Sequence, residues 1–176
     1  MTDATALIGP RLLLRPFGPG DVPAVLAYAS DPEVTRHLEW EAYDDAPTAE
    51  AFIRSTLAGG STWIARAIVL CATDQVIGGA DLRIVSPRDR RAEIGYGLAR
   101  AYWGHGYATE AAGLLLRFGF EQLGLVRIQA LCSVDNDRSA RTLERLGMQR
   151  EGRLARYRWK KGAPRDHWLY AATRAP

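Results

Sequence analysis

A short glycine-containing turn, Trp103-Gly104-His105-Gly106-Tyr107-Ala108-Thr109, lies between a predicted strand and a predicted helix. Glycines let backbone amides face an anion without an intervening side chain, and the start of a helix adds the positive end of its dipole. Thr109 adds a hydroxyl. The pattern predicts a diphosphate site, although a tight turn packed between helix and strand would have the same spacing. Neither the P-loop nor the Gly-x-Gly-x-x-Gly pattern occurs, so the anion belongs to another class of ligand.

The strand before this turn contains two glycines, Gly95 and Gly97. Glycine weakens a strand unless a bulge or a close approach of another backbone is required. We therefore expect an irregularity in strand 92–98, beside the proposed anion site.

Charge is unevenly distributed along the chain, although the net charge is only +3. Residues 31–50 contain seven acids against one base, and residues 150–165 contain seven bases against one acid. Each run could be a solvated surface. Together they suggest one side suited to a cation and another suited to an anion.

Composition narrows the class of protein. At 176 residues, with 47% apolar and 24% charged residues, the chain fits one globular domain over residues 1–176 rather than a disordered or fibrous protein. No apolar run approaches the ~20 residues that span a bilayer, and residues 1–10 lack a signal-peptide pattern, so we expect a cytoplasmic protein without a membrane partner. The three histidines are isolated and no Cys-x-x-Cys occurs, so no metal is expected. Cys71 and Cys132 are interpreted as buried apolar residues rather than redox or acyl-carrying groups.

The hydrophobic patterns predict an α+β fold with one mixed, mostly antiparallel sheet of about seven strands and about four flanking helices. The predicted strands are 11–16, 62–71, 76–84, 92–98, 126–134, 149–159 and 167–173, and the predicted helices are 21–29, 48–57, 107–123 and one starting at Asp135 or Asn136. Asp21 and Thr48 are the expected N-caps of the first two helices. Asp31-Pro32 is the expected end of the first helix. The strand, helix and strand over 92–134 favour a parallel crossover.

Three segments together resemble the GNAT superfamily of N-acetyltransferases, and in particular its Rim-type branch of ribosomal-protein alanine N-acetyltransferases. They are Ala92-Glu-Ile-Gly-Tyr-Gly-Leu98, Tyr102-Trp-Gly-His-Gly-Tyr-Ala-Thr-Glu-Ala-Ala112, and Asn136-x-x-Ser139-x-x-x-Leu143-Glu-Arg-Leu-Gly-Met-x-x-Glu-Gly152. The resemblance covers essentially the whole chain. Trp103 departs from the superfamily's usual Gln or Arg but matches the Rim-type branch.

The resemblance implies a sheet with a splayed centre and acetyl-CoA as cosubstrate. Main-chain amides of Trp103 to Thr109 would bind the pyrophosphate of coenzyme A, with the hydroxyl of Thr109. The backbone of Tyr96, Gly97 and Leu98 would contact the pantetheine arm and polarise the thioester carbonyl. Asn136, also a helix N-cap, and Ser139 would complete the cofactor site.

The same resemblance suggests which residues perform the chemistry. Glu93 is the candidate general base, although it could instead pair with Arg91 or with an arginine of a neighbouring strand. Many members have a tyrosine that acts as the general acid where this chain has Leu143. Ser139 is then the remaining candidate hydroxyl on that helix. Glu110, in the first turn of its helix, is interpreted as structural.

The acceptor is expected to be an amine that binds beside Glu39, Trp40, Glu41 and Tyr43, where acidic side chains would favour a cation. A protein or peptide N-terminus, a polyamine and an aminoglycoside all satisfy this expectation. A protein that binds acetyl-CoA without catalysis is a further alternative. A nucleic-acid partner is not expected, because the basic C-terminal third lacks an aromatic platform or a known motif. The sequence leaves the oligomeric state open, with a homodimer as one option.

Overall fold

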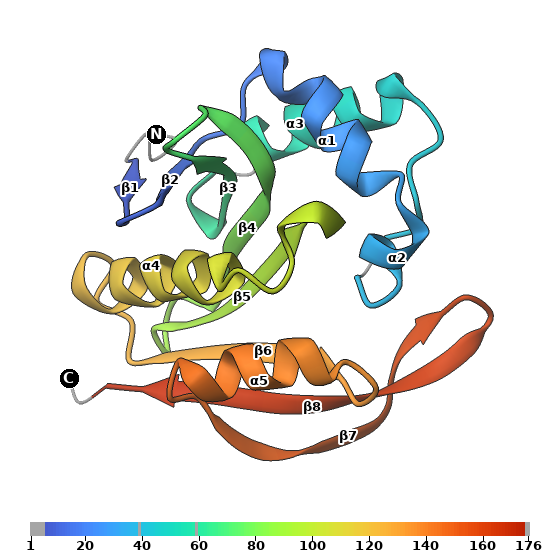
Figure 1. The fold of residues 1–176 in the computed structure, drawn as a ribbon. Helices are drawn as coiled ribbons and strands as arrows, with labels where there is room; N and C mark the ends of the chain where they lie inside the picture. The colour runs from blue at the N-terminus through green and yellow to red at the C-terminus, as the bar shows by residue number, and fades with distance from the viewer. Residues whose placement is uncertain (1–5, 39, 59, 175–176) are drawn as a thin grey trace.

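A computed structural model describes residues 6–38, 40–58 and 60–174. In this part of the chain eight strands form one mixed sheet in the order β1-β2-β3-β4-β5-β6-β8-β7 (Figure 1). The strands are β1 (Leu7–Ile8), β2 (Leu12–Arg15), β3 (Trp63–Leu70), β4 (Gln75–Ser86), β5 (Arg91–Leu98), β6 (Arg127–Ser133), β7 (Gln149–Lys160) and β8 (Ala163–Thr173). The helices are α1 (Val22–Ala29), α2 (Pro32–Thr35), α3 (Ala46–Ala58), α4 (Tyr107–Glu121) and α5 (Asp137–Arg145). The α+β prediction is confirmed, with one more strand, β1, than expected.

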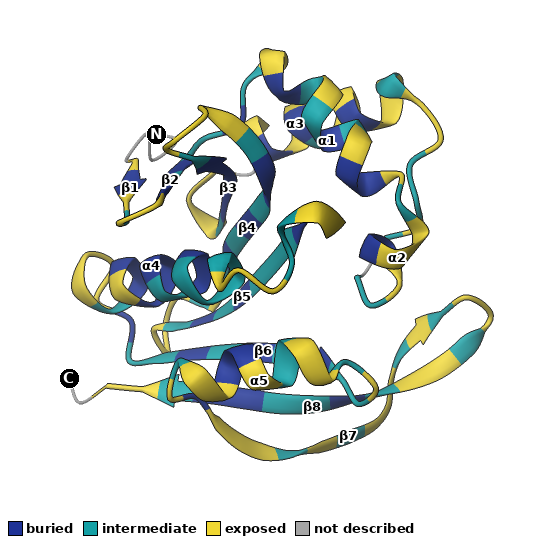
Figure 2. Cartoon of the chain, in the orientation of Figure 1, coloured by how far each residue is buried: buried dark blue, intermediate teal, exposed yellow. Residues whose placement is uncertain are grey.

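Two hydrophobic clusters cover the two faces of the sheet. Residues that alternate along β3 belong to different clusters. Ile64 and Ile68 are part of the cluster that contains α4, whereas Ala65 and Ala67 are part of the cluster under α1 and α3. Since successive side chains of a strand point to opposite faces, the central strands are buried on both sides (Figure 2). Helix α4 is correspondingly apolar around most of its circumference and lies against β4 and β5.

The sheet opens between β5 and β6, the parallel pair that flanks the α4 crossover. Their pairing covers only three positions, Arg91 with Arg127, Ala92 with Ile128 and Glu93 with Gln129. Beyond Glu93 the two strands separate, while β5 keeps its pairing with β4 through Leu98. The expected splayed centre is therefore present, and it begins immediately after Glu93.

The glycines of β5 serve close packing rather than a bulge. Pairing between β4 and β5 is regular from Gly78–Leu98 to Ile84–Ala92, and its irregularity lies further on, between Ile84 and Ser86. A Cβ on Gly95 would approach Asp81 Oδ1 to 2.7 Å. The predicted irregularity at these glycines is thus wrong, because the space at Gly95 is filled by Asp81 of β4 and the space at Gly97 by the side chain of Leu38.

The two predicted helix caps have different outcomes. Asp21 is the N-cap residue of α1 as predicted, but its carboxylate accepts the Gly18 amide at 2.8 Å and pairs with Arg15 at 2.7 Å instead of accepting an amide of the first turn. Thr48 lies inside α3 and is not its N-cap. Helix α3 starts two residues earlier than expected, and Asp45 accepts both the amide and the hydroxyl of Thr48.

The pair Asp31-Pro32, expected to end the first helix, instead begins the short helix α2. Asp31 is the N-cap of α2, and its carboxylate accepts the amide of Glu33 at 2.9 Å. Pro32 follows at the first helical position, where the missing N–H of proline has no cost. This short helix approaches the tip of the β7–β8 hairpin. In the described part of the chain, no helix is long and apolar enough to cross a membrane.

Candidate active site

The glycine turn adopts a backbone that only glycine accommodates without strain. Gly104 and Gly106 have φ angles of +84° and +80°, in the left-handed region. Gly106 is the N-cap of α4, and no side chain caps the helix. The first intrahelical bond is donated by the Glu110 amide to the Gly106 carbonyl. The amides of the first turn therefore remain available to an anion, next to the positive end of the helix dipole.

A part-buried ion pair anchors this turn to the start of the chain. The carboxylate of Glu110 accepts the main-chain amides of Arg11 and Leu12 at 2.8 and 3.1 Å, and the Arg11 Nε at 2.8 Å. Arg11 Nη1 donates to the His105 carbonyl at 2.9 Å, and the guanidinium lies 4.7 Å from the centre of the Tyr107 ring. The structural interpretation of Glu110 agrees with these contacts. Arg11 also places a positive charge beside the turn.

Trp103 connects the turn to β5. Its indole nitrogen donates to the carbonyl of Leu98 at 2.8 Å, and its ring packs against both hydrophobic clusters. The guanidinium of Arg138, from α5, lies 4.9 Å from the ring centre. Leu98 itself is buried. Trp103 therefore fixes the distance between the turn and the end of the strand through its side chain.

A cavity of about 990 Å³ occupies the opening between β5 and β6. Four of the residues expected to contact the cofactor line it, namely Tyr96, Gly97, Asn136 and Ser139. Leu98 and residues 103–109 are not part of its lining, and they lie beyond it toward the start of α4. The turn, at the carboxyl end of β5, and the cavity, in the opening beside β5, therefore lie next to the same strand.

Glu93 lies at the point where the strands separate. Its side chain is 17% exposed and lines the cavity. Oε2 accepts the side-chain amide of Gln129 at 3.1 Å, and Oε1 lies 3.5 Å from Nη2 of Arg158. Both the expected exposure to the cavity and the alternative pairing with an arginine from another strand are present, with Arg158 of β7 as the partner.

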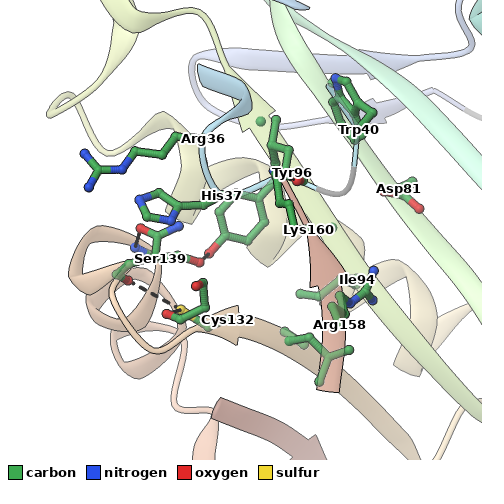
Figure 3. Close-up of a pocket in the computed structure, with 18 of the residues that line it drawn as sticks. Arg36, His37, Trp40, Asp81, Ile94, Tyr96, Cys132, Ser139, Arg158 and Lys160 are labelled. Carbon is green, nitrogen blue, oxygen red and sulfur yellow. Dashed lines mark hydrogen bonds between the residues drawn. The ribbon is translucent and has the colours of Figure 1, made fainter. Parts of the chain in front are cut away.

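On the opposite side of the opening, two hydroxyls meet. Tyr96 extends from β5 to Ser139 of α5, with 3.0 Å between the phenol oxygen and Oγ (Figure 3). Asn136 caps α5 as expected, because its Oδ1 accepts the Ser139 amide at 3.1 Å. Leu143 is only 1% exposed within the core. The hydroxyl of Tyr96, from β5, therefore contacts the helix that has Leu143 in place of a tyrosine.

The acceptor side of the cavity is more aromatic and less acidic than the sequence suggests. Trp40 and Tyr43 line the cavity as expected, whereas Glu41 is outside its lining, with a side chain 65% exposed and 3.9 Å from Lys161. Glu39 lies outside the described residues. The role of Glu41 in acceptor binding stays a prediction, with its carboxylate exposed and directed toward Lys161.

The carboxylates that do line the cavity have cationic or polar partners. Asp81 accepts the indole N–H of Trp63 at 3.0 Å and Nε of Arg83 at 2.9 Å. Asp135 lies 3.5 Å from Nδ1 of His37, which joins the segment after α2 to the loop before α5. These partners keep the wall from being a polyanionic surface.

A lysine closes the cavity from the other side. Lys160, at the end of β7, donates to the carbonyl of Thr35 at 2.6 Å and to that of Leu38. The hairpin therefore holds α2 across the opening, where Figure 3 shows Lys160 and His37 near Tyr96.

The two cysteines differ. Cys132 is buried, and burial raises the pKa of its thiol to about 11. Cys71 is exposed after β3, so its predicted burial is wrong because the chain turns there instead of continuing the strand. In the described residues no group of three His, Cys, Asp or Glu side chains could hold a metal.

A helix-start anion site beside a split parallel strand pair agrees with the comparisons with known proteins. The model of the acetyltransferase (GNAT) domain matches residues 11–149. This chain belongs to the GNAT acetyltransferase family. An uncharacterized N-acetyltransferase, p20 of Bacillus licheniformis, is 34% identical over 165 residues, or 92% of each chain.

Solved GNAT structures share the fold. A GNAT-family acetyltransferase from Bacillus anthracis has a TM-score of 0.88 and 27% identity over 96% of this chain and 98% of its own. A spermidine N-acetyltransferase from Vibrio cholerae, solved with CoA and spermine, has a TM-score of 0.82 and 19% identity over 94% and 96%. The ribosomal-protein-serine acetyltransferase of Escherichia coli is 30% identical over 107 residues, or 61% of this chain and 60% of its own. The GNAT resemblance is therefore confirmed, and this partial relative carries a ribosomal-protein name.

Several residues of the candidate site were not predicted from the sequence. Arg11, from the turn between β1 and β2, contacts the glycine turn, and Asp81 of β4 and Arg158 of β7 line the cavity. His37 stood out in the sequence only as an isolated histidine. Since each of these contacts depends on sheet order, local spacing carries no signal for it.

Proposed function

We propose that this GNAT enzyme transfers an acetyl group from acetyl-CoA to the primary amine of a peptide or protein N-terminus, by direct attack in a ternary complex. The observation that carries the proposal is the opening after Glu93, with a carboxylate on one side and two hydroxyls on the other. Bound acetyl-CoA would supply the activated acetyl group as a thioester.

The residues present fit coenzyme A. The left-handed glycines and the uncapped start of α4 offer main-chain amides to a pyrophosphate, and Arg11 adds positive charge beside them. From there the opening in the sheet could receive the pantetheine arm along the main chain of Tyr96 and Gly97. Asn136 lines the same opening.

Glu93 is the proposed base, which accepts the proton of the attacking amine directly or through water. Its contacts with Gln129 and Arg158 orient the carboxylate at the cavity wall. Cys132 does not compete as a nucleophile, because a thiol with its pKa raised to about 11 is protonated at neutral pH. Direct transfer, without an acyl-enzyme, suits this site.

Glu93→Gln tests this role. We expect kcat at neutral pH to fall by about 100-fold, within the usual range for losing a general base, while the affinity for acetyl-CoA changes little. Calorimetry of acetyl-CoA binding and a thiol-release assay measure the two quantities. An unchanged kcat would remove Glu93 as the base.

The cavity wall favours a peptide amine over a polyamine. Eight aromatic residues line it: Phe17, Tyr28, Trp40, Tyr43, Phe52, Trp63, Tyr96 and Trp159. Its acidic residues are Glu33, Asp81, Glu93 and Asp135, and its lysines and arginines are Arg36, Arg83, Arg158, Lys160, Lys161 and Arg165. With cations more numerous than acids, the wall suits one amine next to an apolar group better than a chain of several ammonium groups.

The relatives act on both classes of acceptor, so a panel of amines tests the choice. We expect peptides with an apolar first residue to be acetylated at their N-terminus with kcat/KM at least about tenfold above that for spermidine or an aminoglycoside, equivalent to about 1.4 kcal/mol of transition-state binding. Preference for spermidine would overturn the peptide assignment. Acetyl-CoA binding without turnover on any amine would instead indicate a non-catalytic binding protein.

A further inference from the structure

The contact between Tyr96 and Ser139 bridges the opening between β5 and the segment that follows β6. The two residues are 43 positions apart, and their hydroxyl oxygens lie 3.0 Å from each other. Both line the cavity, and Figure 3 shows the phenol directed at Ser139 beside Cys132. A pair of hydroxyls therefore stands in the opening opposite Glu93.

The chemistry of the two groups sets the direction of their hydrogen bond. Burial raises the pKa of Tyr96, against the opposing effect of its hydrogen bonds with Ser139 and Thr142, so the phenol keeps its proton. A phenol is a stronger hydrogen-bond donor than an alkyl hydroxyl. With Tyr96 donating to Oγ, Ser139 keeps its own hydrogen to donate, to the neighbouring Cys132 sulfur or toward the cavity, and its acidity is increased by the bond that Oγ accepts.

Other side chains near this point cannot fill the role. Leu143 has no polar group and is buried in the core. The Cys132 thiol donates to the carbonyls of Ser133 and Asn136 at 3.4 Å. The amide of Ser139 is fixed by Asn136, so the serine is held in place at the start of α5.

We propose that Tyr96 and Ser139 form a two-hydroxyl proton relay to the departing sulfur. As the amine nitrogen bonds to the acetyl carbon and the C–S bond breaks, Ser139 gives its proton to sulfur and takes the phenol proton of Tyr96. Solvent water returns a proton to Tyr96, and the proton lost by the amine passes through Glu93 to solvent. Ser139 is the catalytic group, and Tyr96 acts through it. The inference rests on the proposed acetyl transfer.

Kinetics of hydroxyl deletions test the relay. We expect Ser139→Ala to lower kcat by about 100-fold and Tyr96→Phe by at least about tenfold, with KM for acetyl-CoA changed less than about threefold. Ser139→Thr, which keeps a hydroxyl, should recover most of the rate. The double variant should be no slower than Ser139→Ala, because both deletions break one relay. Tyr102→Phe is the matched control, since its hydroxyl bonds Gln75 outside the cavity lining.

A binding measurement separates the relay from a structural role. Calorimetry with CoA and with desulfo-CoA, which lacks the sulfur, should show tighter binding of CoA to the wild-type protein and no preference in Ser139→Ala. Tyr96→Phe should reduce the preference and keep the affinity for desulfo-CoA.

Three results would overturn the relay: Tyr96→Phe with wild-type kcat, deletions whose effects multiply in the double variant, or equal binding of the two ligands by the wild-type protein. Wild-type protein that releases no thiol with any amine would instead refute the proposed function.

Discussion

Replacing Glu110 by alanine should both destabilise the protein and weaken its hold on acetyl-CoA. The carboxylate accepts three N–H groups, two of them main-chain amides, while its own side chain is only 12% exposed. A buried donor left without a partner costs about 1–3 kcal/mol, whereas the bond to the half-exposed Arg11 guanidinium contributes about 0–1 kcal/mol. The Leu12 amide is part-buried, whereas the exposed Arg11 amide can bond to water instead, so the loss is about 2 kcal/mol.

For a protein of this size, that loss lowers Tm by roughly 4–8 °C, since each kcal/mol corresponds to about 2–4 °C. Thermal unfolding followed by circular dichroism measures the shift, and calorimetry measures acetyl-CoA affinity. Glu110→Gln keeps an oxygen for the two amides and should lose about half as much. Glu121→Ala, on the exposed end of the same helix, is the control and should change the free energy of unfolding by less than about 0.5 kcal/mol. A fall in Tm for Glu110→Ala no larger than in the control would refute the anchoring of the turn.

Two further perturbations have defined signs. Gly106→Ala places a Cβ on a residue in the left-handed region, so it should lower the free energy of unfolding by about 1–2 kcal/mol and also weaken acetyl-CoA binding. Gly124→Ala, at φ +63° after α4, is the control: it should lower the free energy of unfolding by a similar amount and leave acetyl-CoA affinity unchanged. The pKa of His37 is lowered, chiefly by burial, so the unfolded chain binds its proton more readily than the folded one. Stability should therefore decrease as pH falls below about 6.5, and urea unfolding of His37→Asn should lack that component, whereas an identical pH dependence would exclude His37 as its source.

The sequence predicts local features of the site well. The glycine turn, the Asn136 cap and the buried helix after the turn are each determined by residues within one or two helical turns of one another. Their physical causes, left-handed backbone at Gly106 and amide satisfaction at the start of a helix, are present in any fold that contains these segments. The resemblance then extended these features to a family and a cosubstrate.

Features that depend on sheet order could not be predicted from local spacing. Arg11 reaches Glu110 from 99 positions away, and Tyr96 reaches Ser139 from 43. The end of the β5–β6 pairing at Glu93 is a property of two strands and the helix between them, so it left no pattern within either strand. The contact between Glu41 and Lys161 could not be predicted for the same reason, because it is made only through the β7–β8 hairpin.

The most direct test of the account is a thiol-release assay with acetyl-CoA and a peptide whose only free amine is its N-terminus, followed by mass spectrometry of the peptide. The account predicts thiol release that requires both substrates, with one acetyl group on the N-terminal nitrogen for each thiol released. Thiol release at the same rate without the peptide, or acetyl-CoA binding with an unmodified peptide, would contradict it.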